Sequence, residues 1–237
     1  MTTLDTNFDF RGDADGGDPD RSSPTLRRYH KALWSRELPS GKTLLLDDRT
    51  KGEYLHHMSE IGEFFFSSDS VIATFLGYKD MIDIASQNSD DDVEEFERIG
   101  FTMGGMLIFP SNQIDRKWTI NMARGMTGSI ADRLDLTLEC IRRHYSGGTS
   151  PLGGVLARYT NFFDLFVDFR GYVEFFLLQD LVTARGLQVA TFLPFDDFVD
   201  SALPRSLSEY LEFRGRTIDF VTRRNHRIDA LQVEVPD

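Results

Sequence analysis

The chain has 237 residues, of which 26 are lysine or arginine and 38 are aspartate or glutamate, giving a formal net charge of −12. A protein that binds nucleic acid over its whole surface is normally basic, so this composition excludes that class and leaves only a local basic groove possible. Hydrophobic residues make up 41% of the chain, and its single cysteine excludes an intramolecular disulfide, which indicates the reducing cytoplasm.

The first twenty residues hold six aspartates against Arg11 alone. Their low hydrophobicity and the pair Gly16-Gly17 predict a mobile acidic tail. This segment lacks the basic start and apolar core of a signal peptide. No apolar stretch elsewhere approaches the roughly 18–20 residues that a transmembrane helix needs, so we expect no membrane association.

The first elements alternate between helices and strands. Ser23-Pro24 is typical of a helix start and predicts a helix through 33. Apolar and aromatic runs predict strands at 42–47, 53–58 and 63–67. The polar residues 68–70 offer N-caps for a helix over 71–84.

Acidic residues at 90–92 suit the N-terminus of a helix that ends at Gly100. The apolar run 101–109 predicts a central strand, and Gly104-Gly105 within it indicates close approach of another backbone or a ligand. Residues 117–121 are expected to return as its hairpin partner. A stripe of apolar residues at helical spacing predicts the clearest helix, 129–145.

The second half is predicted to be mostly helical. Ser150-Pro151 starts a helix, and 161–182 is apolar on nearly every side, as in a deeply buried helix. Residues 187–193 resemble a late strand, and a capping-box pattern at Ser206 opens a last helix to about 228. The predicted fold class is therefore α+β: a mainly antiparallel sheet covered by a helical layer, in a single domain.

The junction 121–129 is the first candidate site. Its glycines precede a predicted helix N-terminus, where backbone amides attract phosphate, and Asn121 and Arg124 offer side-chain donors. The junction lacks the GxxxxGK[ST] pattern of a P-loop. The alternative is a glycine turn in which Ser129 caps the next helix.

The polar face of helix 129–145 is the second candidate. Glu139 lies three and four residues before Arg142 and Arg143, a spacing typical of ion pairs on a solvated face. His144 suits the last turn because of the helix dipole. The competing hypothesis is an acid–base cluster in which Glu139 or His144 transfers protons.

His56 and His57 are the third candidate. On a helix, His56 and Glu60 would share a face and could bind a metal. We favour a strand, on which the two rings point to opposite sides and His57 alone could act as a general base.

The terminal helix carries the only basic patch, with five arginines over 214–227 against Asp219. Arg214 lies in the middle of the apolar stripe of this helix, so it must reach solvent or bind a buried acid or anion. The favoured interpretation is a structural salt bridge together with favourable positive charge at a helix C-terminus. The alternative is contact with phosphate, nucleic acid or an acidic partner.

Six blocks together resemble a known family: 18–35, 59–71, 100–115, 119–125, 130–145 and 161–182. They are similar to an uncharacterised bacterial protein family, a domain of unknown function, with TIN-ARG and DLTLECIRRHY as its specific motifs. The resemblance implies an acidic tail over 1–17 and one domain over 18–237. It supplies no catalytic residue, and it favours Arg124 over Gly128 in the first candidate site.

The leading hypothesis is a cytoplasmic bacterial protein that binds an anionic ligand, either a nucleotide or a nucleic-acid phosphate. The proposed ligand-binding residues are Asn121, Arg124, Arg142, Arg143 and Arg214, and the proposed acid–base residues are His57, His144 and Glu139. If the protein is an enzyme, nucleotide or phosphoester chemistry in a toxin or phage-defence system is expected, with the cofactor left open. The hypothesis requires that the arginines converge on one pocket.

Two alternatives belong to other functional classes. A non-enzymatic interaction module would bind a protein partner through the acidic tail or through Arg223, Arg224 and Arg227. A metal-dependent hydrolase would use His56 or His57 with nearby acids.

Overall fold

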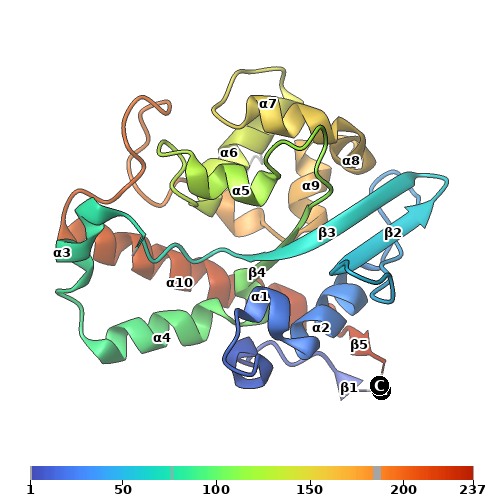
Figure 1. The fold of residues 1–237 in the computed structure, drawn as a ribbon, viewed down its shortest axis with the longest axis horizontal. Coiled ribbons are helices and arrows are strands. Elements are labelled where there is room, and N and C mark those ends of the chain that lie inside the picture. Colours follow the sequence, from blue (N-terminus) through green and yellow to red (C-terminus); the bar gives the residue numbers. More distant parts are fainter. Residues whose placement is uncertain (1, 76, 184–187, 237) are drawn as a thin grey trace.

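The structure, a computed structural model, describes residues 2–75, 77–183 and 188–236. Its strands are β1 (Thr2–Thr3), β2 (Leu55–Ser59), β3 (Gly62–Ser70), β4 (Met106–Pro110) and β5 (Glu234–Val235). Its α-helices are α1 (Pro19–Ser22), α2 (Pro24–Trp34), α3 (Ile82–Ala85), α4 (Asp90–Gly100), α5 (Ile120–Met126), α6 (Leu134–Tyr145), α7 (Gly153–Leu156), α8 (Thr160–Phe163), α9 (Phe169–Phe175) and α10 (Leu207–Asp229) (Figure 1). The predicted α+β class is confirmed, and all strand pairs are antiparallel.

The main sheet has the order β2-β3-β4, with Leu55 opposite Phe66 and Ser67 opposite Phe109. β3 runs through the middle of the molecule, with α5 to α9 on one side and α1 and α2 on the other (Figure 1). Ser68 and Asp69 are neighbours on this strand, so their side chains point to opposite faces. The strand therefore presents one polar residue to each helical group.

The long helix α10 packs against α4 and against the short 3-10 helix Met103–Gly105. A side chain at Gly104 would collide with the Val221 carbonyl of α10. The sequence prediction of a close backbone approach at these glycines is confirmed, although they lie before β4 and not inside it. Within the described residues, no helix has both the length and the apolar character needed to cross a membrane.

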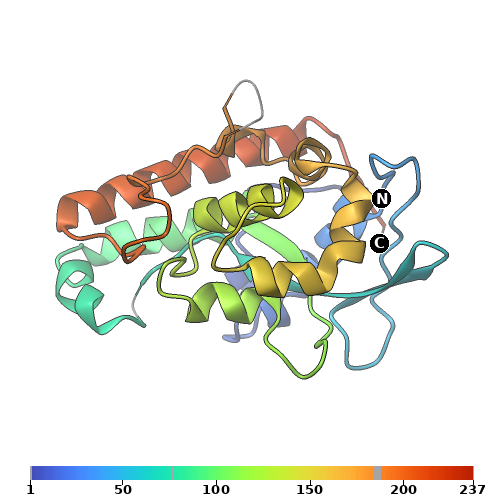
Figure 2. The ribbon, with the colours of Figure 1, turned by 90° about the horizontal axis from the view of Figure 1, so that it is seen from above.

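The acidic N-terminal segment is packed onto the body, contrary to the expected mobile tail. β1 pairs with β5, and Leu4 and Phe10 are buried. Arg11 forms ion pairs with Asp9 and with Glu94 of α4, each at 2.7 Å. These contacts offset the local excess of negative charge, and both termini lie on the same side of the molecule (Figure 2).

Several predicted elements are confirmed. α2 begins after Ser23, whose hydroxyl accepts from the Leu26 amide, and α4 is capped by Ser89. The two strands around Gly62 form the β2–β3 hairpin. α10 is capped by Ser206, whose hydroxyl accepts from the Glu209 amide at 3.2 Å.

The prediction of a helix over 71–84 is wrong. The polar residues expected to cap it continue β3, where Asp69 pairs with Leu107 and Ser70 with Met106. The following chain contains Phe75 at φ 58°, which a helix excludes, and the described residues of this segment after it form only the short 3-10 helix Lys79–Met81 and the single turn α3. Pairing with β4 therefore overrides the local capping signal.

The segment 101–121 also differs from its prediction. The strand begins at Met106, because the residues before it complete α4 and form the turn that receives α10. The predicted hairpin partner is instead the start of α5, with Thr119 accepting from the Met122 amide at 3.4 Å.

The predicted long helices are interrupted by residues with positive φ. Ala131 at 48° and Asp132 at 61° delay the start of α6 to Leu134. Val167 at 70° and Leu177 at 56° divide the segment 161–182 into short helices. The apolar residues are buried as expected, but the chain reaches the core through turns.

Three smaller predictions also change. The segment 42–47 contributes only isolated bridges, from Thr43 to Glu37 and from Asp47 to His56, and not a strand. The predicted strand 187–193 begins at a residue outside the described part, and its described residues contribute only a bridge from Val189 to Val182. The helix expected from Ser150 begins at Gly153.

Candidate functional site

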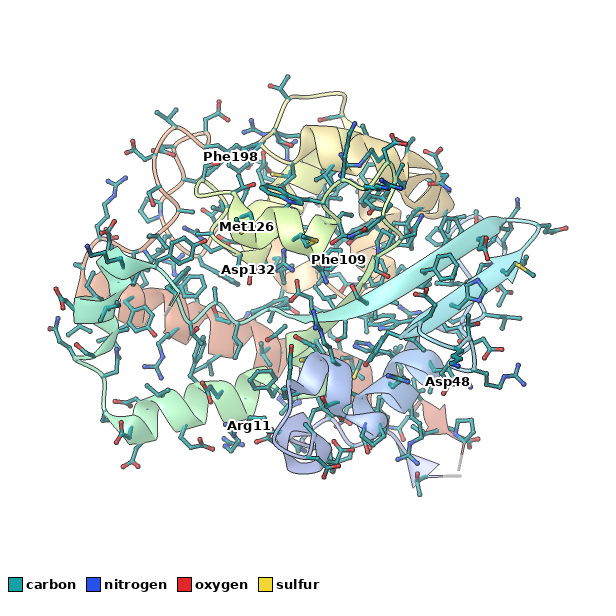
Figure 3. The ribbon with its side chains drawn as sticks, in the orientation of Figure 1. Arg11, Asp48, Phe109, Met126, Asp132 and Phe198 are labelled. Carbon is teal, nitrogen blue, oxygen red and sulfur yellow. The ribbon has the colours of Figure 1, made fainter. Side chains whose placement is uncertain are left out.

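The predicted ligand residues do not share one place. Arg124, on α5, is 1% exposed and lies between Asp69 of β3 and Asp132. Its Nε donates to Thr137 at 3.0 Å and its Nη2 to the Asp132 carbonyl at 3.0 Å. Figure 3 shows Asp132 and Phe109, over whose ring the guanidinium lies, on the α5 side of β3. All three guanidinium nitrogens are therefore engaged inside the protein.

Glu139, Arg142 and Arg143 form a separate cluster on α6. The Glu139 carboxylate accepts from Arg142 and Arg143 at 2.7–2.8 Å. Burial opposes ionisation, but these hydrogen bonds prevail and lower the pKa of Glu139. Arg143 also binds Asp197 and lies over the Phe198 ring. An ionised, doubly bound carboxylate is a poor proton donor, so this geometry favours ion pairing.

The basic patch on α10 is dispersed. Arg214 is buried, and its guanidinium donates to Asn88 at 3.0 Å and to the Asp92 carbonyl, thereby joining α10 to α4. Arg224 is also buried, whereas Arg223 and Arg227 form surface pairs with acids. The expected buried acid beside Arg214 is replaced by uncharged oxygens. Arg124, Arg214 and the α6 arginines thus have separate sets of partners.

The histidines occupy the strand positions that the sequence favours. His57 is buried and its Nε2 lies 2.9 Å from the Ser59 hydroxyl, while His56 stacks on Phe65 on the other face. His144 packs on Phe163, and burial lowers the pKa of His144. Among the described residues, no group of three histidine, cysteine or acidic side chains is arranged to hold a metal.

A pocket of about 410 Å³ lies where α1, β3 and the start of α5 meet, and we call it the α1–β3 pocket. Its polar lining includes Asp18, Asp20, Tyr54, Ser68, Asp69 and Asn121. Of the residues predicted from sequence, only Asn121 lines it; Arg124 lies directly behind it, on Asp69.

Asp20 lines this pocket, forms no ion pair among the described residues and accepts a hydrogen bond from Ser68. Burial, with a smaller contribution from the nearby Asp18, raises the pKa of Asp20 from 3.8 to about 7. Ser68 donates to its Oδ1 at 3.2 Å and partly opposes this rise. A carboxyl that titrates near neutrality is suited to general acid–base work.

A chain of buried hydrogen bonds holds Asp20 in place. The Ser68 hydroxyl lies 3.0 Å from Nε2 of His30, and the Trp34 indole donates to Nδ1 of the same ring at 3.0 Å. Burial, helped by the positive charge of Arg224, lowers the pKa of His30 to about 3, so the ring is neutral. The chain joins the core of α2 to the pocket wall.

Asp69 also lines the pocket. It shares the Arg124 guanidinium with Asp132, so two carboxylates face one cation. Burial raises the pKa of both Asp69 and Asp132, and Arg124 opposes the rise in each. Arg124 is therefore a positioning residue that holds Asp69 at the back of the pocket.

Two further polar atoms beside the pocket lack partners within the described residues. They are the Tyr54 hydroxyl and Oδ1 of Asn121, both closed off from solvent. The amide nitrogen of Asn121 is engaged, since it donates to the Ser67 hydroxyl at 3.1 Å. Buried polar atoms without a partner are costly, so a small rearrangement that brings them onto a ligand would be favourable.

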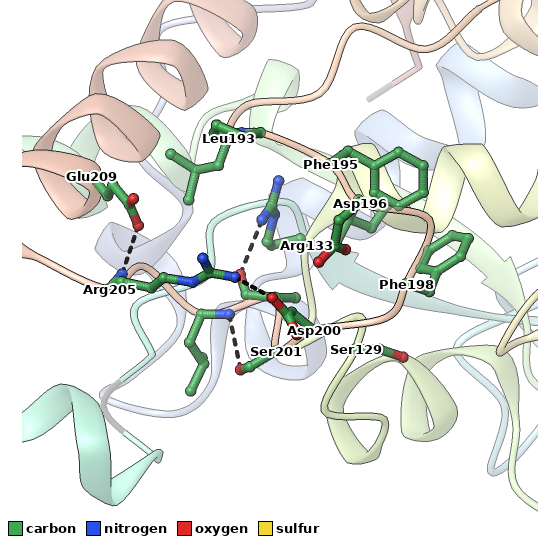
Figure 4. A pocket seen from close by; sticks show the side chains of 14 residues that line it. Ser129, Arg133, Leu193, Phe195, Asp196, Phe198, Asp200, Ser201, Arg205 and Glu209 are labelled. Carbon is green, nitrogen blue, oxygen red and sulfur yellow. Dashed lines mark hydrogen bonds and ion pairs between the residues drawn. The ribbon is translucent and has the colours of Figure 1, made fainter.

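A second pocket, of about 300 Å³, lies under the loop 194–205 (Figure 4). Its cations are already paired: Arg205 binds Asp200 at 2.8 Å, and Arg133 binds Asp135 at 2.7 Å. The α1–β3 pocket is the better candidate, because burial raises the pKa of its acid Asp20 to about 7 and a hydrogen bond from Ser68 holds that carboxyl in place.

Sequence reasoning missed Asp20, Tyr54, Ser68 and Asp69. It counted Asp20 only as charge, and it assigned Ser68 and Asp69 to a helix cap. The available signal was the polar run 67–70 directly after three phenylalanines, because polar residues that continue a buried strand need partners.

Stability is expected to fall as pH rises from about 4 to about 7, because the folded state keeps a proton on Asp20 that the unfolded chain releases. The substitution Asp20→Asn should flatten this dependence, whereas Asp15→Asn, on an exposed aspartate, should preserve it. Urea unfolding at pH 5 and pH 8 measures the difference, and the contributions of Asp69 and Asp132 cancel between variants. Equal pH dependence in Asp20→Asn and the parent would contradict the assignment.

Comparison with known proteins gives one match. Residues 4–228 match the sequence model described as a family of unknown function, DUF6994. No curated protein and no solved structure was found to match the chain.

Proposed function

For this chain, which belongs to the family of unknown function DUF6994, we propose a ligand-binding role for the α1–β3 pocket. The pocket binds a small polar organic molecule, and Asp20 exchanges a proton with that molecule. The observation that carries this proposal is the placement of Asp20 at the pocket wall, fixed by Ser68 and His30 and unpaired with any cation in the described part of the chain. An unbalanced acid in a pocket is a group that a ligand can complete.

The lining favours a ligand that donates hydrogen bonds. Asp18 and Asp20 present carboxyl oxygens, and Asn121 keeps a free acceptor oxygen beside them. Amino and hydroxyl groups are the complementary chemistry. An amine or a polyhydroxyl compound is therefore the expected class.

The anionic-ligand hypothesis required its arginines to converge on one pocket, which they do not, but a different arginine supports a phosphate contact at the α1–β3 pocket. Arg21 is exposed at the rim of this pocket and has no ion pair among the residues that the structure describes. A nucleotide would fit if its base or sugar faced the acids and its phosphate faced Arg21. This places the phosphate contact on α1 and leaves Arg142, Arg143 and Arg214 outside the site.

Asp20→Asn is expected to lower the affinity for the ligand at least about tenfold, since charge-assisted hydrogen bonds contribute roughly this much. The probes are spermidine, adenosine, AMP and glucose, each added separately and followed by thermal shift and calorimetry. Asp15→Asn, which replaces an exposed aspartate outside the pocket lining, is the matched control and should bind like the parent.

The outcomes separate the two ligand classes. Stabilisation by spermidine, adenosine or glucose that Asp20→Asn removes supports the donor-rich ligand. Stabilisation by AMP alone that Arg21→Ala removes supports the nucleotide. If none of the four probes shifts the melting temperature, or if Asp20→Asn binds like the parent, the proposed function is wrong.

A further inference from the structure

The hydrogen-bond chain behind the α1–β3 pocket has a defined direction. An indole N–H only donates, so Nδ1 of His30, 3.0 Å from the Trp34 nitrogen, must accept. A neutral imidazole has one N–H, which then lies on Nε2 and donates to the Ser68 hydroxyl at 3.0 Å. The Ser68 hydrogen is left to point away from His30, toward Oδ1 of Asp20 at 3.2 Å.

The surroundings keep this direction from reversing. His30 is completely buried and lies near the cationic Arg224, and both oppose a second proton on the ring. Reversal would need the proton on Nδ1, where it would meet the indole N–H. The His30 ring also packs edge-to-face against Tyr54 of the pocket wall, with centroids 6.3 Å apart.

We propose that Trp34, His30 and Ser68 are positioning residues for Asp20, which make Oδ1 a permanent acceptor so that the exchangeable proton is carried on Oδ2. The inference rests on the role proposed for Asp20, and it assigns the proton to one atom. The charged groups around this carboxyl are Asp18, which is the N-cap of α1, Asp69 on β3 and Arg124 on α5. Each of these groups affects how much of Asp20 is ionised, whereas the Trp34–His30–Ser68 hydrogen-bond chain determines which carboxyl oxygen carries the proton.

The test is made on the ligand-free full chain by NMR. In the parent, His30 is expected to show a proton on Nε2 and none on Nδ1 from pH 5 to pH 9. Ser68→Ala removes the donor to the ionised form and should raise the Asp20 pKa by about one unit. The matched control is Ser67→Ala on the same strand. The Ser67 hydroxyl accepts from Asn121 and takes no part in the hydrogen-bond chain to Asp20.

Trp34→Phe separates positioning from packing. It keeps a buried aromatic ring but frees Nδ1 of His30, so the proton can move to Nδ1 and Ser68 can turn toward His30. The Asp20 pKa should rise although Ser68 and Asp20 are both unchanged. Trp118→Phe, at the half-exposed tryptophan, should leave this pKa unchanged.

The proposal is overturned if His30 carries its proton on Nδ1 in the parent, or if Ser68→Ala and Ser67→Ala have the same Asp20 pKa. A loss of melting temperature in Trp34→Phe with no change in the Asp20 pKa also overturns it, because that is the result of packing alone. These measurements need no ligand. If the NMR results contradict the hydrogen-bond chain while a ligand still binds in an Asp20-dependent way, only this inference is overturned. If none of the four probes binds, only the proposed function is overturned.

Discussion

Arg224→Ala is expected to lower the free energy of unfolding by about 3 kcal/mol or more, since it opens a cavity and leaves buried carbonyls unpaired. Arg224 is 0% exposed. Its guanidinium donates to the carbonyls of Phe176 at 3.1 Å, Gly104 at 2.8 Å and Met106 at 2.9 Å. It therefore joins α10, the end of α9 and the start of β4.

Arg224 is held without a carboxylate partner among the described residues. Burial, together with the nearby Arg36, lowers the pKa of Arg224 to about 9 although Tyr172 opposes the shift. The Phe176 carbonyl lies at the C-terminus of α9, where the helix dipole is negative and favours a cation. The planar guanidinium spans three carbonyls, and a lysine in its place has no such geometry.

The adjacent Arg223 is the matched control. Its side chain is 60% exposed and pairs with Asp219 at 2.9 Å, so Arg223→Ala should change stability by less than about 0.5 kcal/mol. Urea unfolding followed by circular dichroism measures both variants. Similar midpoints for Arg223→Ala and Arg224→Ala would show that the carbonyl contacts contribute little.

Asp135→Asn is expected to cost about 3–5 kcal/mol, because it leaves the buried Arg133 charge without its counter-ion. Asp135 is 0% and Arg133 is 3% exposed. Asp135 also accepts from the Phe192 amide at 2.7 Å. An asparagine keeps one acceptor oxygen, but its amide group would meet the Arg133 Nε, which donates to the second carboxylate oxygen at 3.2 Å.

Two comparisons define this result. Asp219→Asn makes the same chemical change at an exposed ion pair and should have little effect on stability. The double variant Arg133→Met with Asp135→Leu removes both charges, so it should be more stable than Asp135→Asn alone. A double variant that is less stable would mean that the pair contributes more than its own desolvation.

Asp135 also shows where sequence reasoning fails. Spacing along α6 placed the acids opposite the apolar stripe, which indicated a solvated face. The chain around Phe192 returns over this face, and its backbone amide binds Asp135. Such a contact joins positions 57 residues apart, and helical periodicity contains no information about it.

Residues that cap a helix were sufficient to predict those helices whose ends depend on local hydrogen bonds. Capping signals at Ser23 and Ser206 predicted α2 and α10 nearly at their observed bounds, and the acidic run 90–92 with Gly100 did the same for α4. The failures lie where tertiary contacts prevail over propensity. Ser70 pairs with Met106 instead of capping a helix, and left-handed residues such as Ala131 interrupt predicted helices.

The candidate site was predicted only at its edge. Asn121 and Arg124 were chosen as ligands for phosphate, and the structure places one on the pocket wall and the other behind it, bound to Asp69. Asp20, His30 and Ser68 come from α1, α2 and β3, so no spacing pattern links them. Their association depends on how the helices pack on the sheet, which the sequence pattern leaves open.

The pairing of β1 with β5 has a consequence for synthesis. Thr2 and Thr3 bond to strand residues Val235 and Glu234, and the Leu4 amide donates to the Val233 carbonyl at 3.0 Å. On the ribosome, β1 must therefore wait for its partner until residues 234–235 have emerged. Until then Leu4, which is buried in the folded protein, lacks its backbone partner at Val233, so this apolar residue stays exposed longer than one that pairs locally.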